Sequence, residues 1–343
     1  MQARRSRLLV VPTILIAVFL SAGGCNHRKE FRFSGATMGT TYHITVVAPF
    51  WSSLSRLEQL IREELLALNQ SMSVYDPKSE ISRFNAMTDT VAALEISDRF
   101  ADVLEISNDV WRRTRGAFDP TVFPLVKLWG FNTDGSPKLP DAASIEAAKQ
   151  RVGFDRVRFD ARNRIGKTIP NVGIDLSAIA KGYGVDRVAG VVRNAGYTDF
   201  IVEIGGEVFA AGRKSDGQPW KIGINYPDVA APPDLVYKTL LLSDRAVATS
   251  GNYRNFQNIE GKRYTHIIDP QTGTPIDNGI ASVTVLADTC ALADGLATGL
   301  MVMGPEQAIP LVEQWPGVDC LFLVKDAEGK LIEFASSGFG KTP

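Results

Sequence analysis

Cysteine is scarce in this chain of 343 residues, which contains only three, at positions 25, 290 and 320. No two of them have the CxxC spacing typical of metal–thiolate sites, so a site of that kind is not expected. Cys290 and Cys320 could form a disulfide in an oxidising compartment, or they could be two small buried apolar residues.

An excess of charge of one sign is also lacking, because 37 lysines and arginines face 38 aspartates and glutamates. A nucleic-acid-binding protein would show a basic face, so no nucleic-acid partner is expected. Low-complexity segments and internal repeats are absent from the sequence as well. With 45% hydrophobic and 22% charged residues, the composition is that of an ordinary globular protein.

The N-terminal segment has the features of an export signal. The apolar run 8–20 follows three arginines and is too short to span a membrane comfortably as a helix. Small residues then lead to Cys25. The pattern resembles a bacterial lipoprotein signal, in which cleavage leaves a lipid-carrying cysteine, although Ala22 stands where such signals usually have Leu. Ordinary secretion with cleavage after a small residue is the alternative.

We therefore predict a signal peptide over residues 1–24, a lipidated Cys25 with a tether over 25–33, and one domain over 34–343. The protein would work outside the cytoplasm, anchored by lipid to a bacterial membrane on its periplasmic side. Residues 1–24 carry three arginines and no acid, so their removal changes the formal net charge from −1 to −4.

Hydrophobic periodicity predicts strands and helices with no long linker between them. Helical spacing of apolar residues predicts helices over about 53–70, from Ser97 onward, and over 141–152, 177–195, 289–303 and 305–314. Strands are expected over 40–48 and near 199–204, 207–212, 220–225, 237–242, 264–268, 280–287, 319–325 and 331–334. Strand-rich runs flanked by helices indicate the α+β class rather than a doubly wound sheet.

One carboxylate, Asp294, lies in the middle of an apolar helical segment, DTCALADGLATGLMVMG, residues 288–304. The helix should be buried, and a buried carboxylate needs a partner. Thr298 lies one turn further on the same face, and two such hard oxygen donors suit Mg²⁺ better than zinc. Bonding of Asp294 to a neighbouring loop, and of Thr298 to its own helix, is an equally good interpretation. Asp288 should cap the helix.

Three further segments give weaker signals. In GIDLSAIAKGYGVDRV, residues 173–188, a strand should end at Asp175 and a helix should open, so that the helix N-terminus and Lys181 could bind phosphate; a capped amphipathic helix explains the pattern as well. The glycine pair 205–206 indicates a tight hairpin turn. In GAFDPTVFPLVKLWGF, residues 116–131, the aromatic-rich stretch after Asp119 could bind a planar ligand or could be core.

The chain has three histidines, and His266 has the most unusual setting, within YTHIIDPQTG, residues 264–273. An imidazole that is neutral near pH 7 suits proton abstraction. However, no Ser or Cys triad pattern surrounds it, and a satisfied strand histidine is the ordinary interpretation. The Asp-Pro turn that follows needs no function, because an Asx turn explains it.

Seven motifs in order resemble the ApbE family of flavin transferases, over about Ser34 to Phe334. They are GATMGTTY, SVYDPKSEISRFN, GAFDPTV, IDLSAIAKGYGVD, EIGGE, SGNY followed by YTHIIDPQTG, and ADGLATGLMVMG. Ser177 departs from the glycine common at its position. The resemblance implies an α+β, T-fold-related architecture of mixed sheets with flanking helices, and FAD in a cleft between the halves.

By this resemblance the protein would be an FAD:protein FMN transferase. It would move FMN from FAD to a Thr or Ser hydroxyl of a target flavoprotein through a phosphoester, with Mg²⁺ as cofactor and AMP as the second product. His266 corresponds to the family's candidate base, and Asp294, Thr298 and the Ala178 carbonyl to its Mg²⁺ ligands. Positions that correspond to FAD contacts are Met38, Tyr75, Ala117, Phe118, Asp119, Asp175, Lys181 and Ile268.

Acceptors in this family carry a DxxSGAT-like site, for example in subunits of redox-driven ion pumps. Residues 34–37 read SGAT, but Phe31 stands where acceptors carry Asp, so self-modification is not expected. Two other functions stay open. A metal-dependent FAD pyrophosphatase would release free FMN and AMP without an acceptor. Asp294, Thr298 and His266 together speak against a lipid-anchored protein that only binds FAD, because such a protein would need no base.

Overall fold

The computed structural model describes residues 28–131, 139–160, 162–232, 234–253 and 256–341. The predicted signal peptide and Cys25 lie outside the described residues. An eight-stranded sheet forms the centre, in the order β1-β2-β6-β7-β10-β13-β14-β15, with every neighbouring pair antiparallel. Its strands are β1 (Arg28–Thr37), β2 (Thr40–Pro49), β6 (Phe200–Ile204), β7 (Glu207–Ala211), β10 (Arg245–Gly251), β13 (Ile280–Ala287), β14 (Asp319–Lys325) and β15 (Leu331–Ala335).

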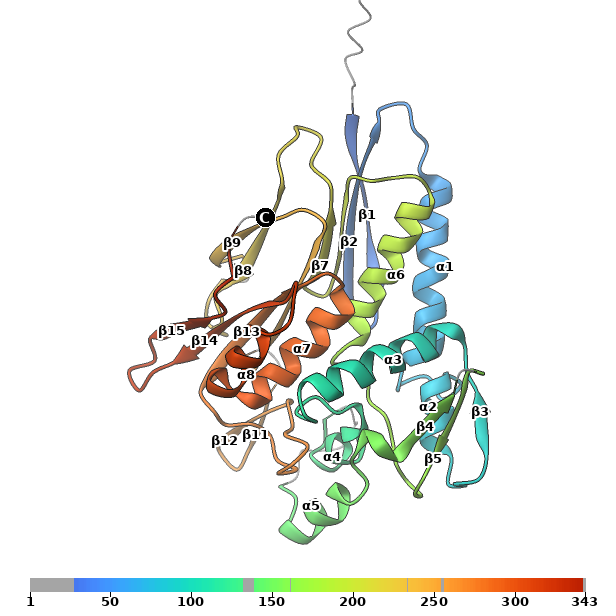
Figure 1. Ribbon diagram of the computed structural model, residues 1–343, viewed down its shortest axis with the longest axis vertical. Helices are drawn as coiled ribbons and strands as arrows, with labels where there is room; N and C mark the ends of the chain where they lie inside the picture. Colours follow the sequence, from blue (N-terminus) through green and yellow to red (C-terminus); the bar gives the residue numbers. More distant parts are fainter. Residues whose placement is uncertain (1–27, 132–138, 161, 233, 254–255, 342–343) are drawn as a thin grey trace, which may run out of the picture.

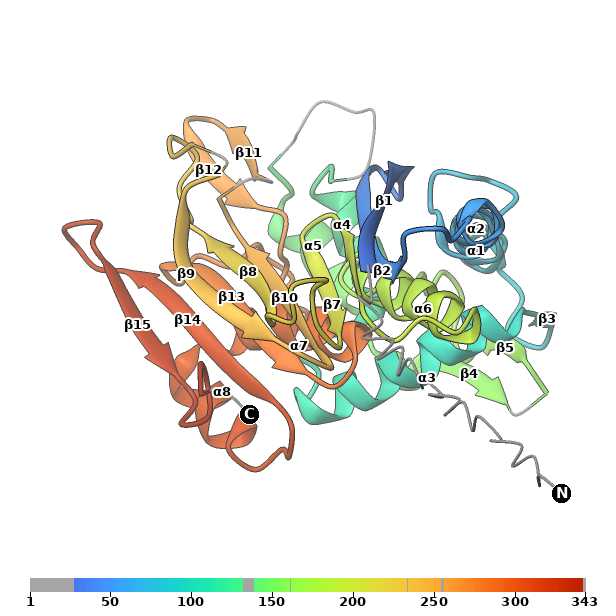
Figure 2. The same cartoon turned by 90° about the horizontal axis from the view of Figure 1, so that it is seen from above.

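Helices cover one face of this sheet, and a two-stranded ribbon covers the other (Figures 1 and 2). On the helical face, α6 (Ala180–Asn194) packs on β6 and β7, and α7 (Cys290–Met303) packs on β10 and β13. The ribbon consists of β8 (Trp220–Asn225) and β9 (Val236–Leu242), whose Trp220 and Leu240 join a second apolar cluster with Val208 and Leu286. The central strands are therefore buried on both sides.

The other elements lie around the helical layer. They are α1 (Ser55–Met72), α2 (Glu80–Ala86), β3 (Ala93–Glu95), α3 (Asp98–Arg113), the 3₁₀ turn η1 (Pro120–Val122), α4 (Phe123–Leu128), α5 (Ala142–Lys149), the 3₁₀ turn η2 (Phe154–Arg156), β4 (Val157–Asp160), β5 (Arg164–Lys167), β11 (Phe256–Ile259), β12 (Lys262–Thr265) and α8 (Pro305–Val312). The α4–α5 pair lies at the opposite end of the molecule from the start of β1 (Figure 1). None of the described helices combines the length and apolar character that crossing a bilayer requires.

A buried carboxylate joins three of the helices. Glu64 of α1 accepts two hydrogen bonds from the Arg99 guanidinium of α3, at 3.0 and 2.5 Å, and one from Arg187 of α6, at 2.9 Å. Burial acts to raise the pKa of Glu64, but the two guanidinium groups outweigh it and hold that pKa below its usual range. The ionised form of Glu64 therefore stabilises the packing of α1, α3 and α6.

The strongly periodic elements appear close to their predicted positions. The α+β class is confirmed, and so are the 53–70 helix, the 280–287 strand and the Ser97 cap, whose hydroxyl accepts from the Phe100 amide. The Gly205-Gly206 hairpin turn is also present, with φ of 59° and 100°. Cys290 and Cys320 are both buried and unbonded, which supports the apolar interpretation.

Several expectations were wrong. Residues 28–33, expected in the tether, form the first part of β1. No strand ends at Asp175, because residues 172–176 are buried without regular pairing, and the following helix begins only at Ala180. The strand expected over 264–268 is β12, which ends at Thr265, so that His266 lies in a bend after it.

Candidate active site

The N-terminal ends of α6 and α7 meet at Asp294. This side chain is 3% exposed, and its Oδ2 accepts a hydrogen bond of 2.9 Å from the Gly182 amide in the first turn of α6. A Cβ atom on Gly182 would lie 2.3 Å from the Cys290 carbonyl oxygen and 2.7 Å from the Asp294 Cβ. Glycine at 182 is therefore needed for the close approach that lets Asp294 reach the backbone of α6.

A second carboxylate makes the reciprocal contact. Asp186 of α6 accepts hydrogen bonds of 2.8 Å from both the Cys290 and the Ala291 amides, the first two residues of α7. The prediction that Asp288 caps α7 was wrong. The N-cap residue is Thr289, and its side chain makes no capping hydrogen bond. Burial raises the pKa of Asp186 to about 6, although its two backbone hydrogen bonds oppose this shift.

Lys181 joins Asp294 to a third acid. Its Nζ lies 3.3 Å from Glu207 Oε1 and 3.8 Å from Asp294 Oδ1. Burial disfavours the Lys181 charge, but the two carboxylates outweigh burial and raise the lysine pKa. Burial and the nearby Asp294 raise the pKa of Glu207 to about 8, against the effect of Lys181. The result is a cluster of two buried acids that share one cation.

The predicted metal ligands are compatible with a hard divalent cation. Thr298 is half-buried one turn after Asp294, and its Oγ1 lies 2.9 Å from the Ser250 Oγ of β10. Ala178 lies in the turn just before α6, whose backbone Asp294 contacts. The described residues contain no group of three or more His, Cys, Asp or Glu side chains suited to a metal. One carboxylate, one hydroxyl and one carbonyl are nonetheless donors that Mg²⁺ accepts, completed by water or phosphate.

Most of the predicted flavin residues lie on neighbouring segments around this junction. Met38, in the β1–β2 turn with φ of 47°, lies against Gly184 of α6, because a Cβ there would be 3.0 Å from its Cε. Phe118 lies against Gly299 of α7 in the same way, at 3.0 Å. The Asp175 amide donates to the Pro120 carbonyl at 2.7 Å, which joins the 117–120 loop to the segment before α6.

Asp119 stabilises the 117–120 loop through its hydrogen bonds. Its buried carboxylate accepts from the Thr121 amide and hydroxyl, the Phe154 amide and the Trp111 indole. Burial raises the pKa of Asp119, although these hydrogen bonds oppose the shift. Four donors thus hold the carboxylate, and Asp119 with them holds the buried Ala117 and Phe118 in place.

The remaining predicted residues lie on loops outside the helix junction. Ile268 is buried in a third apolar cluster with Leu125 and Trp129 of the α4 region. The Trp129 indole donates to the Gly273 carbonyl at 2.9 Å, which fixes the loop after His266. His266 is half-buried, and Tyr75 follows α1 and is 73% exposed.

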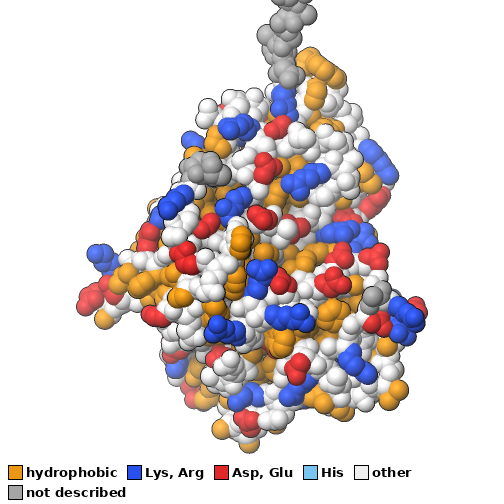
Figure 3. All heavy atoms as spheres, viewed as in Figure 1, with side chains coloured by type: hydrophobic (Ala, Val, Ile, Leu, Met, Phe, Trp, Pro, Cys, Tyr) orange, Lys and Arg blue, Asp and Glu red, His pale blue; other side chains and the backbone are white. Residues whose placement is uncertain are grey.

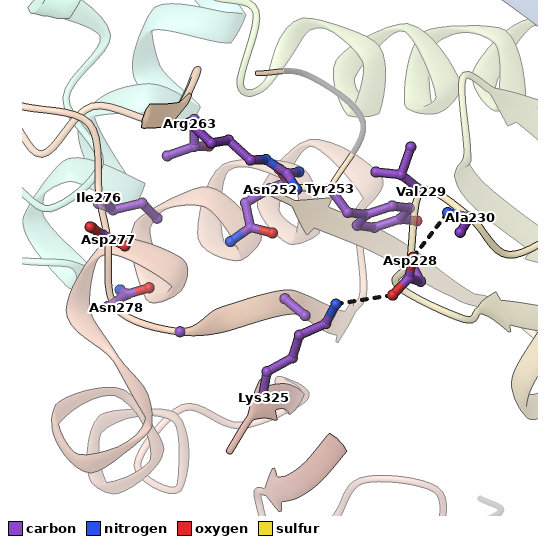
Figure 4. A pocket seen from close by; sticks show the side chains of 13 residues that line it. Asp228, Val229, Ala230, Asn252, Tyr253, Arg263, Ile276, Asp277, Asn278 and Lys325 are labelled. Atoms are coloured by element: carbon purple, nitrogen blue, oxygen red, sulfur yellow. Dashed lines mark hydrogen bonds and ion pairs between the residues drawn. The ribbon is translucent and has the colours of Figure 1, made fainter. Parts of the chain in front are cut away.

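A pocket of about 450 Å³ opens beside the His266 loop (Figure 4). Thr265, the residue before His266, lines it together with Asn252 and Tyr253 of the SGNY motif. Its rim carries charges of both signs, including an ion pair of 3.1 Å between Lys325 and Asp228. None of the predicted flavin or metal residues lines the pocket, so it is separate from the helix junction.

Three residues of the site were missed in the sequence. Asp186 and Glu207 lie in quoted motifs, in which the local pattern predicts only an ordinary helix and an ordinary turn. An acid that directly precedes four apolar residues was the available signal for Glu207, and all five of these residues are buried in β7. Ser250 opens the quoted SGNY motif, but its contact with Thr298 spans 48 residues of chain, which a local pattern does not reveal.

Comparison with known proteins identifies the family to which the chain is similar. The ApbE family matches residues 38–322. An FAD:protein FMN transferase of Vibrio cholerae is 40% identical, covering 95% of this chain and 97% of that protein; one of Haemophilus influenzae is 37% identical, covering 97% of both. The solved flavin transferase ApbE from Vibrio cholerae has a TM-score of 0.82 at 40% identity, covering 91% and 98% of the two chains. The solved flavinyl transferase ApbE of Pseudomonas stutzeri, in its apo form, has a TM-score of 0.81 at 34% identity, covering 91% of this chain and 96% of that chain.

These matches extend over nearly all of the described residues, and they confirm the family resemblance that the seven motifs indicate. The chain belongs to the ApbE family.

Proposed function

We propose that this protein is an FAD:protein FMN transferase that moves FMN from FAD to a Ser or Thr hydroxyl of a target flavoprotein. The proposal is supported most directly by the relative that is 40% identical over 95% of the chain and carries that name. Lys181, in the first turn of α6 beside Asp294, supports it independently, because a lysine at a helix N-terminus suits a phosphate group.

The transfer forms one P–O bond and breaks another. The acceptor hydroxyl attacks the phosphorus on the FMN side of the FAD pyrophosphate, and the bridging oxygen leaves with AMP. We assign to His266 the removal of the hydroxyl proton as attack proceeds. A general base of this kind contributes on the order of 10²–10⁴ in rate.

Asp294, Thr298 and the carbonyl of Ala178 would hold Mg²⁺. When bound, the ion supplies positive charge that offsets the charge of the pyrophosphate. Lys181 adds a cation in the first turn of α6, and the positive end of the helix dipole favours a phosphate group further. Asp119 and its four donors keep the 117–119 loop rigid, so that the flavin meets a preformed surface.

We assign the approach of the acceptor to the pocket beside Thr265. Thr265, which lines the pocket, directly precedes His266 in the chain. The charges of both signs around the pocket suit a polar polypeptide segment better than a second flavin. An acceptor with a DxxSGAT-like site, such as a subunit of a redox-driven ion pump, is the partner to test first.

Intact-protein mass spectrometry decides between transfer and hydrolysis. The protein is mixed with FAD, Mg²⁺ and an acceptor domain that carries a DxxSGAT-type site. Transfer adds one FMN to the acceptor, and EDTA prevents it. Free FMN and AMP with an unmodified acceptor would replace the proposal by a pyrophosphatase. Intact FAD with two acceptors of different origin would leave a flavin-binding protein.

We also propose that Cys25 is lipidated and that the protein acts on the periplasmic side of a bacterial membrane. The basic, apolar and small-residue pattern of residues 1–25 supports this localisation. Replacement Cys25→Ser should move the protein from the membrane fraction to the soluble fraction. An unchanged membrane fraction would exclude lipidation as the anchor.

A further inference from the structure

Two large aromatic side chains are exposed at the end of the molecule where β1 begins. Phe50 and Trp51 directly follow β2, and they are 57% and 70% exposed. Their rings contact each other edge to face, with centroids 4.9 Å apart. Pro49 pairs with Arg28, the first described residue, so the two rings lie beside the start of β1. Hydrophobic side chains are visible at this end in Figure 3.

We call the end formed by Arg28, Phe50 and Trp51 the tip. The chain between Cys25 and Arg28 is too short to separate the tip from a lipid on Cys25. Three residues span at most about 11 Å when fully extended. Acyl chains on Cys25 would hold the first residue of β1 at the headgroup region. Trp and Phe are favoured there, and the exposed Lys29 and Arg56 can approach anionic headgroups.

We propose that Phe50 and Trp51 insert into the bilayer interface as a second membrane contact beside the lipid anchor. The inference goes beyond the transferase reaction and rests on the proposed lipidation. Two contacts fix the orientation of the body, which a single flexible anchor would leave free. The α4–α5 end then points away from the membrane (Figure 1).

Quenching by brominated lipids tests the contact. The full-length protein, as the cell exports and processes it, is placed in phosphatidylglycerol-containing vesicles with brominated acyl chains, and tryptophan emission is compared with that in unbrominated vesicles. The chain has five tryptophans, and Trp51→Phe removes only the exposed one at the tip. We expect bromolipid quenching in the wild type, its loss in Trp51→Phe, and its retention in Leu66→Ser, which alters an apolar residue of α1 that is 59% exposed.

The other outcomes overturn the inference in distinguishable ways. Vesicle-bound protein without quenching shows an anchor and no inserted tip. Quenching that persists in Trp51→Phe places another tryptophan in the bilayer. Failure of the wild-type protein to associate with vesicles removes the lipidation proposal together with the tip, while the transferase assay is unaffected.

A different observation concerns Glu207, which the proposed reaction does not use. Glu207 opens β7 after the glycine turn and is 4% exposed. Its Oε1 lies 3.3 Å from Lys181 Nζ, and its Oε2 has no hydrogen-bond partner among the described residues. A buried carboxyl group with an unsatisfied oxygen is costly unless the site uses it.

The position of Lys181 explains such a use. In this structure its ammonium is shared between Glu207 and Asp294. A divalent cation bound by Asp294 would repel that ammonium, because like charges a few ångströms apart in a buried site interact strongly. Its stem is confined, since a Cβ on Gly205 would lie 3.1 Å from the Lys181 Cδ. Glu207 is the acceptor that remains.

We infer that Glu207 is a positioning residue that holds Lys181 away from the metal when Asp294 binds a divalent cation. The inference rests on the proposed metal site and adds a residue to it. Without the Glu207 carboxyl group to hold it, Lys181 would compete with the cation for Asp294.

Calorimetric titration of the full chain with Mg²⁺, in the absence of FAD, tests this role. Glu207→Gln should weaken Mg²⁺ binding about tenfold, which corresponds to about 1.4 kcal/mol. The double variant Glu207→Gln/Lys181→Met should recover the affinity, because the competing cation is gone. The control Glu203→Gln changes an acid of the same hairpin that pairs with His43, and should bind as the wild type does.

Each alternative gives a different pattern. Weak binding that persists in the double variant would make Glu207 a direct ligand and overturn the inference. Unchanged binding in Glu207→Gln, with binding lost in Asp294→Asn, overturns it while the metal site stands. A wild-type chain that binds no Mg²⁺ removes the metal assignment itself.

Discussion

Removal of the Asp186 carboxylate should destabilise the protein more than the loss of an ordinary helix cap. The Cys290 and Ala291 amides that donate to Asp186 belong to residues with 0% exposure. Water cannot replace the lost acceptor there. A hydrogen bond to a charged group contributes about 1.5–3 kcal/mol, so Asp186→Ala should lower the free energy of unfolding by about 3 kcal/mol or more.

Urea unfolding followed by circular dichroism measures this loss, with Asp141→Ala as the matched control. Asp141 caps α5 through one bond to the Ser144 amide at the surface, where water can take its place, so its loss should be clearly smaller. Asp186→Asn keeps one acceptor oxygen and should fall between the wild type and Asp186→Ala. Equal losses in Asp186→Ala and Asp141→Ala would refute the reasoning that burial decides the magnitude.

Three further predictions follow from the site and its support. Asp294→Ala should abolish Mg²⁺-dependent FMN transfer while the circular dichroism spectrum stays native; normal transfer would exclude Asp294 as a ligand. His266→Ala should retain FAD in equilibrium dialysis and lose about 10²–10⁴ in transfer rate; an unchanged rate would make the imidazole structural. Because Arg99 and Arg187 depress the Glu64 pKa, its contribution to stability is present above about pH 4.5 and is lost as the pH falls through the lower folded value. The free energy of unfolding, measured between pH 5 and about 2, should therefore fall less steeply in Glu64→Gln than in the wild type. Parallel profiles would contradict a stabilising role of the ionised Glu64.

Local pattern and spacing predicted the elements whose burial is one-sided and regular. The helix α1 buries Leu57, Ile61, Leu65 and Leu68 at helical spacing, and its periodicity is visible in the sequence. The first part of β1 was not predicted, for the opposite reason. It is an edge strand whose residues are mostly half-buried or exposed, and its charged residues at 28–30 are typical of a protected edge and also of a tether.

The chemistry of the site depends on contacts between distant residues, which periodicity does not report. The sequence indicated that Asp294 was buried and needed a partner, but the partner is the Gly182 amide, 112 residues away. Asp186 reaches α7 across 104 residues. The family resemblance supplied the identities of the candidate ligands, whereas the mutual support of α6 and α7 became visible only in three dimensions.

The length of α6 also fixes the distance between Lys181 and the tip. Its N-terminal turn carries Lys181, and its C-terminal end leads to Asp199, which pairs with Arg28 at the tip. Fifteen residues of helix extend about 22 Å. If the tip rests on the bilayer, α6 acts as a spacer that keeps the end carrying Lys181 at a fixed distance from the membrane. A membrane-bound acceptor at that distance would meet the enzyme by diffusion in two dimensions, with a raised effective concentration. An acceptor that presents its hydroxyl nearer the lipid would be excluded by geometry alone.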